Sequence, residues 1–251
     1  MLPGVEHERQ SSADGLGRSV RLFRLFLGEQ RDPEAFYTSI ADDAVAMVEQ
    51  HVRLNGLVVA DFGGGPGFYS EAFRRAGASA LVVDLDPGEV RAHGRTGFDT
   101  VVARAEKSPL RDGSVDLAFS SNLLEHVPDL GPVADQMVRV VRPGGYVVLS
   151  YTIWHGPWGG HETSPWHLLG GHRGRRHYER RHGKAPKNKY GETMFAASAA
   201  GGMRWLRERG DLDVLQLRPR YLPLWLRWLV RVPVLREVVT WNLWMVLRVP
   251  S

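Results

Sequence analysis

The segment from Val58 to Tyr69 constrains the fold of this 251-residue chain more than any other. It reads VVADFGGGPGFY: an apolar strand, an acidic residue, a glycine-dense turn and the start of a helix. Glycines in such a turn let a ligand lie against bare backbone at a helix N-terminus. The glycine spacing is G-x-G-x-G, and the dinucleotide fingerprint G-x-G-x-x-G fails because Phe68 and Ser70 stand where it needs glycine. The segment therefore predicts a strand-turn-helix unit that can bind a ligand.

A second acidic residue strengthens this prediction. The β-like run from Ala80 to Val83 ends in Asp84, and the first run ends at Asp61. In nucleotide-binding α/β folds, a carboxylate at the tip of the second strand binds the ribose hydroxyls. The alternative is an ordinary turn without a ligand, but the two acidic residues together favour a nucleotide-type site.

Strand-like and helix-like patterns alternate along most of the chain. Strands are expected near 57–62, 79–84, 98–103, 115–121, 146–152, 213–217 and 241–249, and helices near 17–30, 33–52, 67–76, 87–93, 132–141 and 196–209. This alternation is typical of an α/β fold with a doubly wound, mostly parallel sheet. We therefore predict a seven-stranded sheet of this kind.

Four motifs between Leu57 and Ser150 follow one another in a recognisable order. They are DFGGGPG at 61–67, VVDLDP at 82–87, ARAEKSPLRDGSVDL at 103–117, and SSNLLEHV at 120–127 followed by RVVRPGG at 139–145. Together they resemble the class I S-adenosylmethionine-dependent methyltransferases of the small-molecule type 11 group. The runs QRDPEAFY at 30–37, SYTIW at 150–154 with GGHE at 159–162, and VPVLRE at 232–237 extend the resemblance to uncharacterised actinobacterial members.

The resemblance implies a Rossmann-like methyltransferase fold, S-adenosylmethionine as cofactor, and a set of cofactor-binding residues. Asp61 would lie near the ammonium group, Asp84 at the ribose and Asn122 at the transferable methyl. The full set is Tyr37, Asp61, Gly63, Gly65, Asp84, Leu85, Ala105, Glu106 and Asn122. One departure is Arg104, which replaces an adenine-binding Asp; since arginine has no acceptor, a backbone carbonyl or Glu106 would take that role.

The predicted domain plan has three parts and two insertions. Residues 1–15 form a disordered tail, 16–53 form helices that cover the cofactor, and 54–251 form the methyltransferase domain. The insertion at 154–195 follows the fifth strand, where it is expected to be a mobile lid. A second segment, the hydrophobic flap at 220–236, is rich in tryptophan and arginine and favours either core packing or an interfacial patch.

Three histidines are candidate bases for deprotonating a hydroxyl acceptor. His126 follows the fourth strand, and His155 and His161 follow the fifth. The alternatives are a packing or capping role for His126 and plain loop positions for the other two. The spacing of His161, His167 and His172 with Glu162 matches no familiar ligand set, so we predict no metal site.

Composition and charge indicate where in the cell the protein is expected and what its surface could bind. The chain has no cysteine, no apolar run of membrane-spanning length and no signal-peptide pattern at its start, so we expect it in the cytoplasm. Arg173 to Lys189 carries eight Lys/Arg against one Glu. Such a run is either a solvated face or a surface that attracts anions. The second reading would allow peripheral contact with the inner face of a membrane.

The predicted function is S-adenosylmethionine-dependent methyl transfer to a small-molecule or lipid-linked acceptor, including a glycolipid, at oxygen. A nucleic-acid methyltransferase is a rival because of the basic run, but only Tyr178 and Tyr190 are there to stack bases, so a nucleic-acid partner is disfavoured. The sequence SNLL after the fourth strand also differs from the N-P-P-Y pattern of base-nitrogen methyltransferases. Arg104 motivates a second rival, a catalytically silent cofactor-binding protein.

Overall fold

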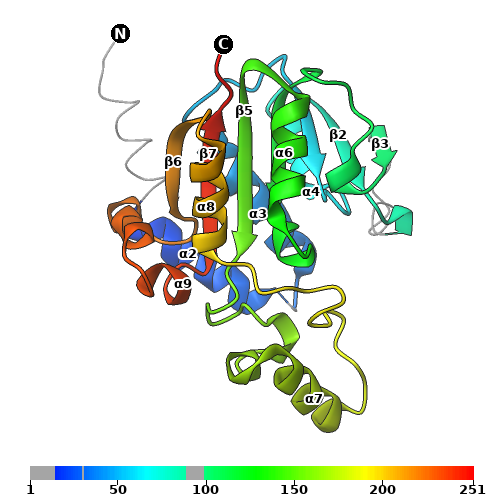
Figure 1. Ribbon diagram of the computed structural model, residues 1–251, viewed down its shortest axis with the longest axis vertical. Helices are drawn as coiled ribbons and strands as arrows, with labels where there is room; N and C mark the ends of the chain where they lie inside the picture. Colours follow the sequence, from blue (N-terminus) through cyan, green and yellow to red (C-terminus); the bar gives the residue numbers. More distant parts are fainter. Residues whose placement is uncertain (1–14, 30, 89–98) are drawn as a thin grey trace.

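The computed structural model describes residues 15–29, 31–88 and 99–251. They contain one seven-stranded sheet in the order β3-β2-β1-β4-β5-β7-β6 (Figure 1). The strands are β1 (Val58–Phe62), β2 (Ser79–Asp84), β3 (Asp99–Val102), β4 (Val115–Ser121), β5 (Val141–Thr152), β6 (Asp213–Pro219) and β7 (Asn242–Arg248). Only β7 runs antiparallel to its neighbours β5 and β6. The predicted mostly parallel seven-stranded sheet is confirmed.

Helices cover both faces of this sheet (Figure 1). The helices packed on the two cores include α3 (Pro33–Val48), α4 (Phe68–Arg75), α6 (Leu130–Val140) and α8 (Ala199–Arg209). The other described α-helices are α2 (Leu16–Gly28), α7 (Gly171–His182) and α9 (Leu235–Val238). One core lies between α3, α4 and the sheet, around Phe73 and Phe119, and the other lies beneath α6 and α8, around Met137 and Trp205. Because both faces are covered, the central strands are apolar nearly throughout.

Local sequence explains where several helices begin and end. Asp32 caps α3 by accepting from the Ala35 amide, and Pro33 follows at the first helical position. Ser198 caps α8 by accepting from the Gly201 amide, and α8 ends at Gly210 in the left-handed conformation. The predicted bounds of these helices differ from the observed ones by a few residues.

A buried ion pair holds α2 against the rest of the molecule. Arg18 Nε lies 2.7 Å from Asp43 Oδ1 and Arg18 Nη2 lies 2.6 Å from Asp43 Oδ2. The third guanidinium nitrogen donates to the carbonyl of Arg220, 2.8 Å away. Both side chains are almost fully buried. The predicted N-terminal helices are therefore present, and α2 is fixed to α3 and to the start of the flap.

The insertion at 154–195 folds into short helices rather than an open loop. It contains η4 (His161–Thr163), η5 (Trp166–Leu169) and α7, and it projects beyond the carboxyl ends of the parallel strands (Figure 1). Its centre is Trp154, whose ring lies 4.7 Å from that of Tyr190 and 5.1 Å from that of His167. Whether the insertion acts as a mobile lid stays a prediction.

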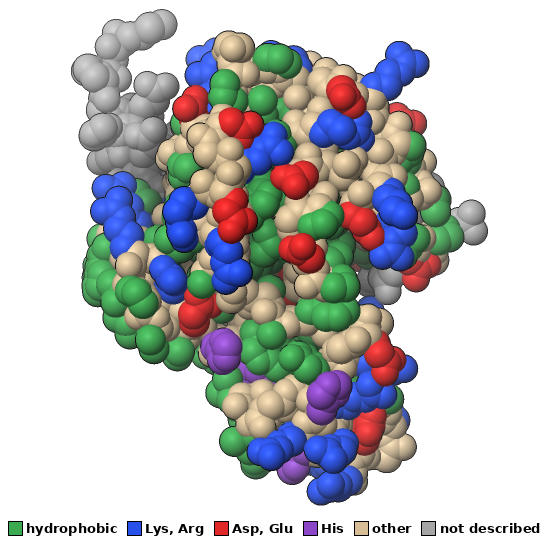
Figure 2. Space-filling model, in the orientation of Figure 1, with side chains coloured by type: hydrophobic (Ala, Val, Ile, Leu, Met, Phe, Trp, Pro, Cys, Tyr) green, Lys and Arg blue, Asp and Glu red, His purple; other side chains and the backbone are tan. Residues whose placement is uncertain are grey.

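The flap at 220–236 is largely helical as well. It comprises Arg220 to Pro223, η6 (Leu224–Arg231) and the beginning of α9. Leu229 and Val230 are buried, whereas Trp225 is 68% and Trp228 47% exposed. Figure 2 shows hydrophobic side chains gathered over this part of the surface. The segment therefore packs on the core through Leu229 and Val230 and exposes two tryptophans; whether its exposed side meets lipid stays a prediction.

Some predictions fall outside what the structure describes or differ from it. The tail predicted at 1–15 lies almost entirely outside the described residues, as does most of the helix predicted near 87–93. Strand β5 begins at Val141 rather than near 146, because Val141 already pairs with Val115 before the ladder becomes irregular. None of the described helices is long and apolar enough to cross a membrane.

Candidate active site

The glycine turn after β1 has the conformation that its sequence predicts. Gly63, Gly65 and Gly67 have φ values of +70°, +46° and +82°, which favour glycine. Gly67 is the residue that precedes the first turn of α4. A Cβ added to Gly65 would meet no atom within 4 Å, so open space lies in front of this residue. The turn therefore leaves its backbone accessible at a helix N-terminus, as a ligand would require.

Asp61 is a buried carboxylate directly before this turn. It is 1% exposed, and its Oδ2 accepts from Ser70 Oγ at 3.0 Å. Burial is the largest cause that raises the pKa of Asp61 to about 7; the charge of Asp84 acts in the same direction, and hydrogen bonds from the Ser70 side chain and backbone oppose both. A cationic group next to this buried carboxylate would favour its ionised form.

Asp84 reaches the same turn from the end of β2. Its Oδ2 accepts from the Gly65 amide at 2.9 Å, and its Oδ1 accepts from the Asp86 amide at 2.9 Å. Leu85 follows it and is 58% exposed. The two strands that end in acidic residues are neighbours in parallel register, with Asp61 opposite Val82. The structure thus brings Asp61, Asp84 and the glycines together, as the motif spacing predicts.

Other predicted cofactor residues lie on separate elements, and their approach to the cofactor stays a prediction. The Tyr37 ring lies 5.4 Å from that of Phe68, and its hydroxyl donates to Glu29 at 2.9 Å. Ala105 is buried in η2 (Ala105–Lys107), and next to it Arg104 Nε donates to Glu106 Oε1 at 2.5 Å. Glu106 is thus engaged by the arginine that departs from the motif, so reading of adenine by the Glu106 carboxylate stays a prediction.

Asn122 sits at the end of β4 in a left-handed conformation, with φ +57°. Its amide donates to the Ser150 carbonyl at 2.8 Å, and its Oδ1 accepts from Asn242 Nδ2 at 2.9 Å. Thr152 Oγ1 lies 3.5 Å from the same oxygen. Strands β5 and β7 therefore fix the Asn122 side chain at the carboxyl edge of the sheet.

A compact group lies next to Asn122 in the fold and consists of Glu125, His126 and His161. One nitrogen or oxygen of each lies within 4.8 Å of the others. The two imidazole rings are 5.6 Å apart, and His126 Nδ1 lies 2.7 Å from the Thr193 carbonyl oxygen. Burial lowers the pKa of His161 below its ordinary value, and the charges of Glu125 and His126 act on it in opposite directions. We call these three residues the Glu–His–His group.

Sequence reasoning found two members of this group and missed the third. Glu125 is 2% exposed and accepts from the Thr152 amide through Oε1 at 3.2 Å. Its only sequence signal was its position beside His126 in the fourth motif. His155, the third candidate base, is exposed on the surface and lies outside the group. Its role as a base therefore stays a prediction without support from its neighbours.

The other histidines of the insertion have structural partners. His167 is fully buried, and its Nε2 lies 2.9 Å from the Trp154 carbonyl and 3.2 Å from the Gly156 carbonyl. Glu162 accepts from Asn188, and His172 packs its ring 5.1 Å from that of Tyr190. These residues do not join His161 in a ligand group within the described part of the chain.

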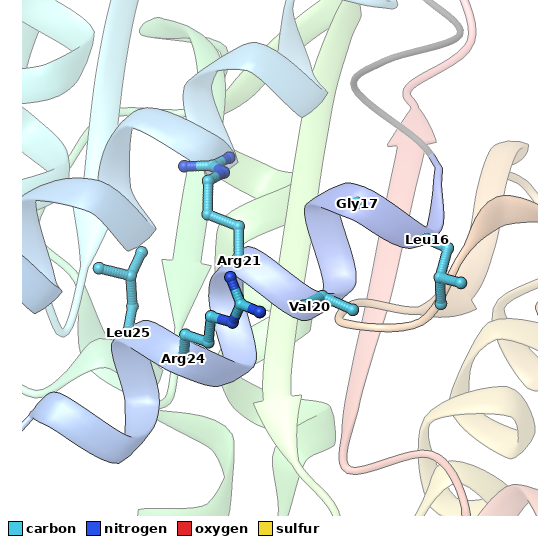
Figure 3. Close-up of a pocket in the computed structure, with 6 residues that line it drawn as sticks. All are labelled: Leu16, Gly17, Val20, Arg21, Arg24 and Leu25. Atoms are coloured by element: carbon cyan, nitrogen blue, oxygen red, sulfur yellow. The ribbon is translucent and has the colours of Figure 1, made fainter.

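A cavity of about 580 Å³ lies elsewhere, along α2 (Figure 3). Its walls are the side chains and backbone of Leu16, Gly17, Val20, Arg21, Arg24 and Leu25. None of these residues belongs to the glycine turn or the Glu–His–His group. The cavity is therefore separate from the predicted cofactor site.

Comparison with known proteins identifies the family. A family model described as "Methyltransferase domain" matches residues 60–149. An uncharacterized methyltransferase of Mycolicibacterium gilvum is 47% identical over 244 residues, covering 93% of this chain and 94% of the relative. The chain belongs to the class I S-adenosylmethionine-dependent methyltransferases. Another uncharacterized methyltransferase, from Mycobacteroides abscessus, is 44% identical to this methyltransferase over 246 residues, with 93% and 94% covered.

Solved structures show the same fold. An S-adenosylmethionine-dependent methyltransferase from Mesorhizobium loti superposes on this methyltransferase with a TM-score of 0.56 at 22% identity, covering 82% of this chain and 97% of that one. A second, described as a putative S-adenosylmethionine-dependent methyltransferase from Listeria monocytogenes, gives 0.56 at 10% identity, covering 85% and 100%. S-adenosylmethionine is the cofactor of this methyltransferase, and it supplies a methyl group activated on a sulfonium. The open space at Gly65 and the buried carboxyl group of Asp61 fit such a cationic ligand.

Proposed function

We propose that this methyltransferase acts on a hydroxyl oxygen of an anionic, amphiphilic acceptor, of which a lipid-linked sugar is an example. The observation that carries the proposal is the surface around the carboxyl edge of the sheet, where apolar and basic segments flank the Glu–His–His group. The cofactor roles proposed for Tyr37, Asp61, Gly63, Gly65, Asp84, Leu85, Ala105, Glu106 and Asn122 follow the family pattern. The structure supports them by grouping Asp61, Asp84 and the glycines.

The apolar support comes from α2 and the flap. The Phe26 ring of α2 lies 5.0 Å from that of Trp158, which in turn lies 4.7 Å from that of Trp241. Through these rings α2 packs against the insertion and against the residue before β7. Nearby apolar side chains remain exposed: Leu16, Leu27, Trp225, Trp228, Val234 and Val238. An exposed patch of this kind, with tryptophan and arginine mixed, is typical of a surface that meets lipid or another apolar partner.

The basic support comes from α7. Arg175 is engaged by Glu179 and Glu192, at 2.9 Å and 2.6 Å. Four further arginines are exposed: Arg173, Arg176, Arg180 and Arg181. Figure 2 shows Lys and Arg side chains over this projecting lobe. Clustered positive charge raises the local concentration of an anionic ligand and speeds its arrival.

The chemistry proposed for the site is removal of the hydroxyl proton as the acceptor oxygen attacks. A carbonyl oxygen can only accept, so the contact with Thr193 places the hydrogen of His126 on Nδ1 and leaves Nε2 with a lone pair. Burial lowers the pKa of His161, which favours its neutral form with a free lone pair. Closure of the insertion over the edge would exclude water from the reacting groups.

The nucleic-acid alternative has less support. Stacking on bases would need exposed aromatic rings in the basic segment. The Tyr178 ring is already stacked on His182, with ring centroids 4.3 Å apart, and the Tyr190 ring packs against Trp154 and His172. Both tyrosines named from the sequence are thus engaged inside the insertion.

Sedimentation with lipid vesicles tests the acceptor class. We expect the protein to sediment with vesicles containing about one-third anionic lipid at low salt, and less at physiological salt because charge is screened. Trp225→Ala with Trp228→Ala should reduce the bound fraction by about tenfold, the loss expected from removing two partly buried aromatic contacts. The control is Val214→Ala with Leu215→Ala, which removes exposed apolar side chains from β6.

Two outcomes would contradict the proposal. One is absence of sedimentation at any salt; the other is equal loss in the β6 control. A second measurement follows tritium from methyl-labelled cofactor after incubation with cell extracts. Label in the organic phase that resists mild alkali indicates a methyl ether on an amphiphile. Label only in the aqueous phase, or lost as methanol, contradicts the acceptor assigned here.

A further inference from the structure

The Glu–His–His group contains buried polar atoms that lack partners. Glu125 uses Oε1 for the Thr152 amide, but its Oε2 is buried and accepts no hydrogen bond. His161 Nε2 is likewise buried without a partner. Buried polar atoms of native proteins are nearly always satisfied, so two unpartnered atoms in one group need an explanation. Both belong to residues whose ligand atoms lie within 4.8 Å of one another and of His126.

A bound divalent metal ion would satisfy all three residues at once. Ligand atoms about 2.1 Å from a tetrahedral ion lie about 3.4 Å from one another. The observed separations of up to 4.8 Å are therefore closed by small side-chain rotations. No hydrogen bond joins the three side chains to one another among the described contacts, so nothing has to be broken to bring them in.

The state of each side chain suits a ligand. His126 donates from Nδ1 to the Thr193 carbonyl, which is the arrangement that fixes the tautomer and orientation of metal-binding histidines. His161 Nε2 is buried and has no hydrogen-bond partner that would compete with a metal ion. The Thr152 amide orients Glu125 in the same way through its first oxygen. Two of the three ligands, Glu125 and His126, would thus be held by a second contact from the protein.

We propose that Glu125, His126 and His161 bind one divalent metal ion, with zinc or a similar borderline ion favoured by the ligand set. Two imidazoles and one carboxylate leave a coordination position open for a further ligand. Thr152 connects this group to Asn122. Its Oγ1 lies 3.5 Å from Asn122 Oδ1, and its amide donates to Glu125, so the open position would face the region of Asn122.

The role of the ion rests on the proposed function, whereas ion binding itself does not. An acceptor hydroxyl bound at the open position would have a lowered pKa. It would release its proton to solvent and keep the electron pair on oxygen. As that oxygen bonds the methyl carbon, the carbon–sulfur bond of S-adenosylmethionine would break, and the electron pair would stay on the sulfur of the departing S-adenosylhomocysteine. In this arrangement the two histidines are ligands, and the bound ion acidifies the hydroxyl in place of a free base.

Metal binding is measured directly on the untagged, full-length protein. After dialysis against zinc, cobalt(II) or manganese(II), elemental analysis should find about one ion per chain. The cobalt form should show the visible absorption of a four- or five-coordinate site. We expect His161→Gln and Glu125→Gln to weaken binding by at least about tenfold. The matched control is His172→Gln, which removes an exposed insertion histidine outside the group.

Each result separates the metal site from the proposed function. Wild-type protein that holds far less than one ion, or that binds equally well after His161→Gln, overturns the metal site. Cofactor affinity and cooperative unfolding, measured on every variant, show whether a loss comes from misfolding. Stoichiometric metal binding without methyl transfer to any hydroxyl would instead contradict the proposed function. Methyl transfer that persists after the ion is chelated would leave the acceptor class standing and remove the ion from the mechanism.

Discussion

At the scale of single residues, the cofactor site is built from two carboxylates in different surroundings. Two backbone amides at the glycine turn donate to Asp84, whereas Asp61 is buried and is held by Ser70. Burial raises the pKa of Asp61 to about 7, although the hydrogen bonds from Ser70 lower it. A cation next to Asp61 would stabilise the ionised carboxylate and so offset the cost of burying its charge.

This difference predicts how stability depends on pH. The folded protein without cofactor keeps a proton on Asp61 up to about pH 7, whereas the unfolded chain loses it near pH 3.8. Between these values the folded state binds more protons, so the Asp61 contribution to stability is lost as pH rises. We expect the free energy of unfolding of wild type relative to Asp61→Asn to fall by about 2–3 kcal/mol from pH 5 to pH 8.

Urea denaturation at the two pH values measures this difference. The control is Asp86→Asn, which removes an exposed carboxyl at the same edge and should leave the wild-type slope unchanged. Equal slopes for wild type and Asp61→Asn would contradict the raised pKa. Saturating cofactor should flatten the wild-type slope, because a bound ammonium would hold Asp61 ionised at both pH values.

Residues within one local motif could be predicted from the sequence, whereas residues joined by tertiary structure could not. Asp61, Gly65 and Asp84 meet because the ends of adjacent parallel strands meet, and that follows from the strand order of the motif. The approach of His161 to His126 depends on how the insertion folds around Trp154. No residue spacing in the sequence predicts that contact. The burial of Glu125 could not be predicted either, because it also depends on tertiary packing.

At the scale of elements, α2 shows how a surface helix can be fixed by one buried interaction. Its exposed side includes Leu16 and Leu27, so its attachment depends on Leu22, the aromatic contacts and Arg18. The guanidinium of Arg18 makes two hydrogen bonds to Asp43 and one to the flap. Removing Arg18 would leave the buried Asp43 carboxylate with Arg21, a half-exposed partner whose Nη2 lies 3.5 Å from Asp43 Oδ1.

We therefore predict that Arg18→Met lowers the free energy of unfolding by about 3–5 kcal/mol, because the Asp43 carboxylate stays buried. Urea denaturation measures the loss. Arg24→Met on the exposed side of the same helix is the control, with an expected change within about 0.5 kcal/mol. A second variant, Arg18→Met with Asp43→Leu, should recover much of the loss. Equal effects of Arg18→Met and Arg24→Met would show that the pair does not hold α2.

The elements themselves were largely readable from periodicity and turn residues. β5 is the instructive exception, because Pro143, Gly144 and Gly145 read as a turn that should delay the strand. In the structure Val141 pairs with Val115, the register then shifts, and regular pairing resumes at Tyr146. Local turn chemistry placed the start of the strand near 146, whereas the strand begins at Val141 and continues through the irregularity.

At the scale of the whole molecule, the cofactor turn and the insertion lie at the same edge of the sheet but are packed separately. The insertion has its own packed centre at Trp154, His167 and Tyr190, and it projects away from the sheet (Figure 1). Its links to the main domain include the Phe195 amide, which donates to the Glu125 carbonyl at 2.8 Å. Cofactor binding and acceptor binding should therefore be separable.

We predict that replacing residues 161–189 with a flexible glycine-serine linker leaves cofactor affinity within about threefold and abolishes methyl transfer. Calorimetry with S-adenosylmethionine and a transfer assay measure the two effects. The comparison variant, Asp84→Ala, should instead weaken the affinity for S-adenosylmethionine by about 1.5–3 kcal/mol. Loss of cofactor binding in a linker variant that still unfolds cooperatively would assign the segment to the cofactor site.

The position of β7 in the sheet has a consequence for synthesis on the ribosome. β7 follows every other strand in the chain, yet it lies between β5 and β6 and pairs with both. Until it emerges, β5 presents an unpaired, apolar edge and β6 has no strand to join. An open edge of this kind is where nascent chains associate wrongly. We expect ribosome-bound chains that stop before Asn242 to be degraded by protease. Ribosome-bound chains in which an added C-terminal linker carries all of β7 out of the ribosome should resist it.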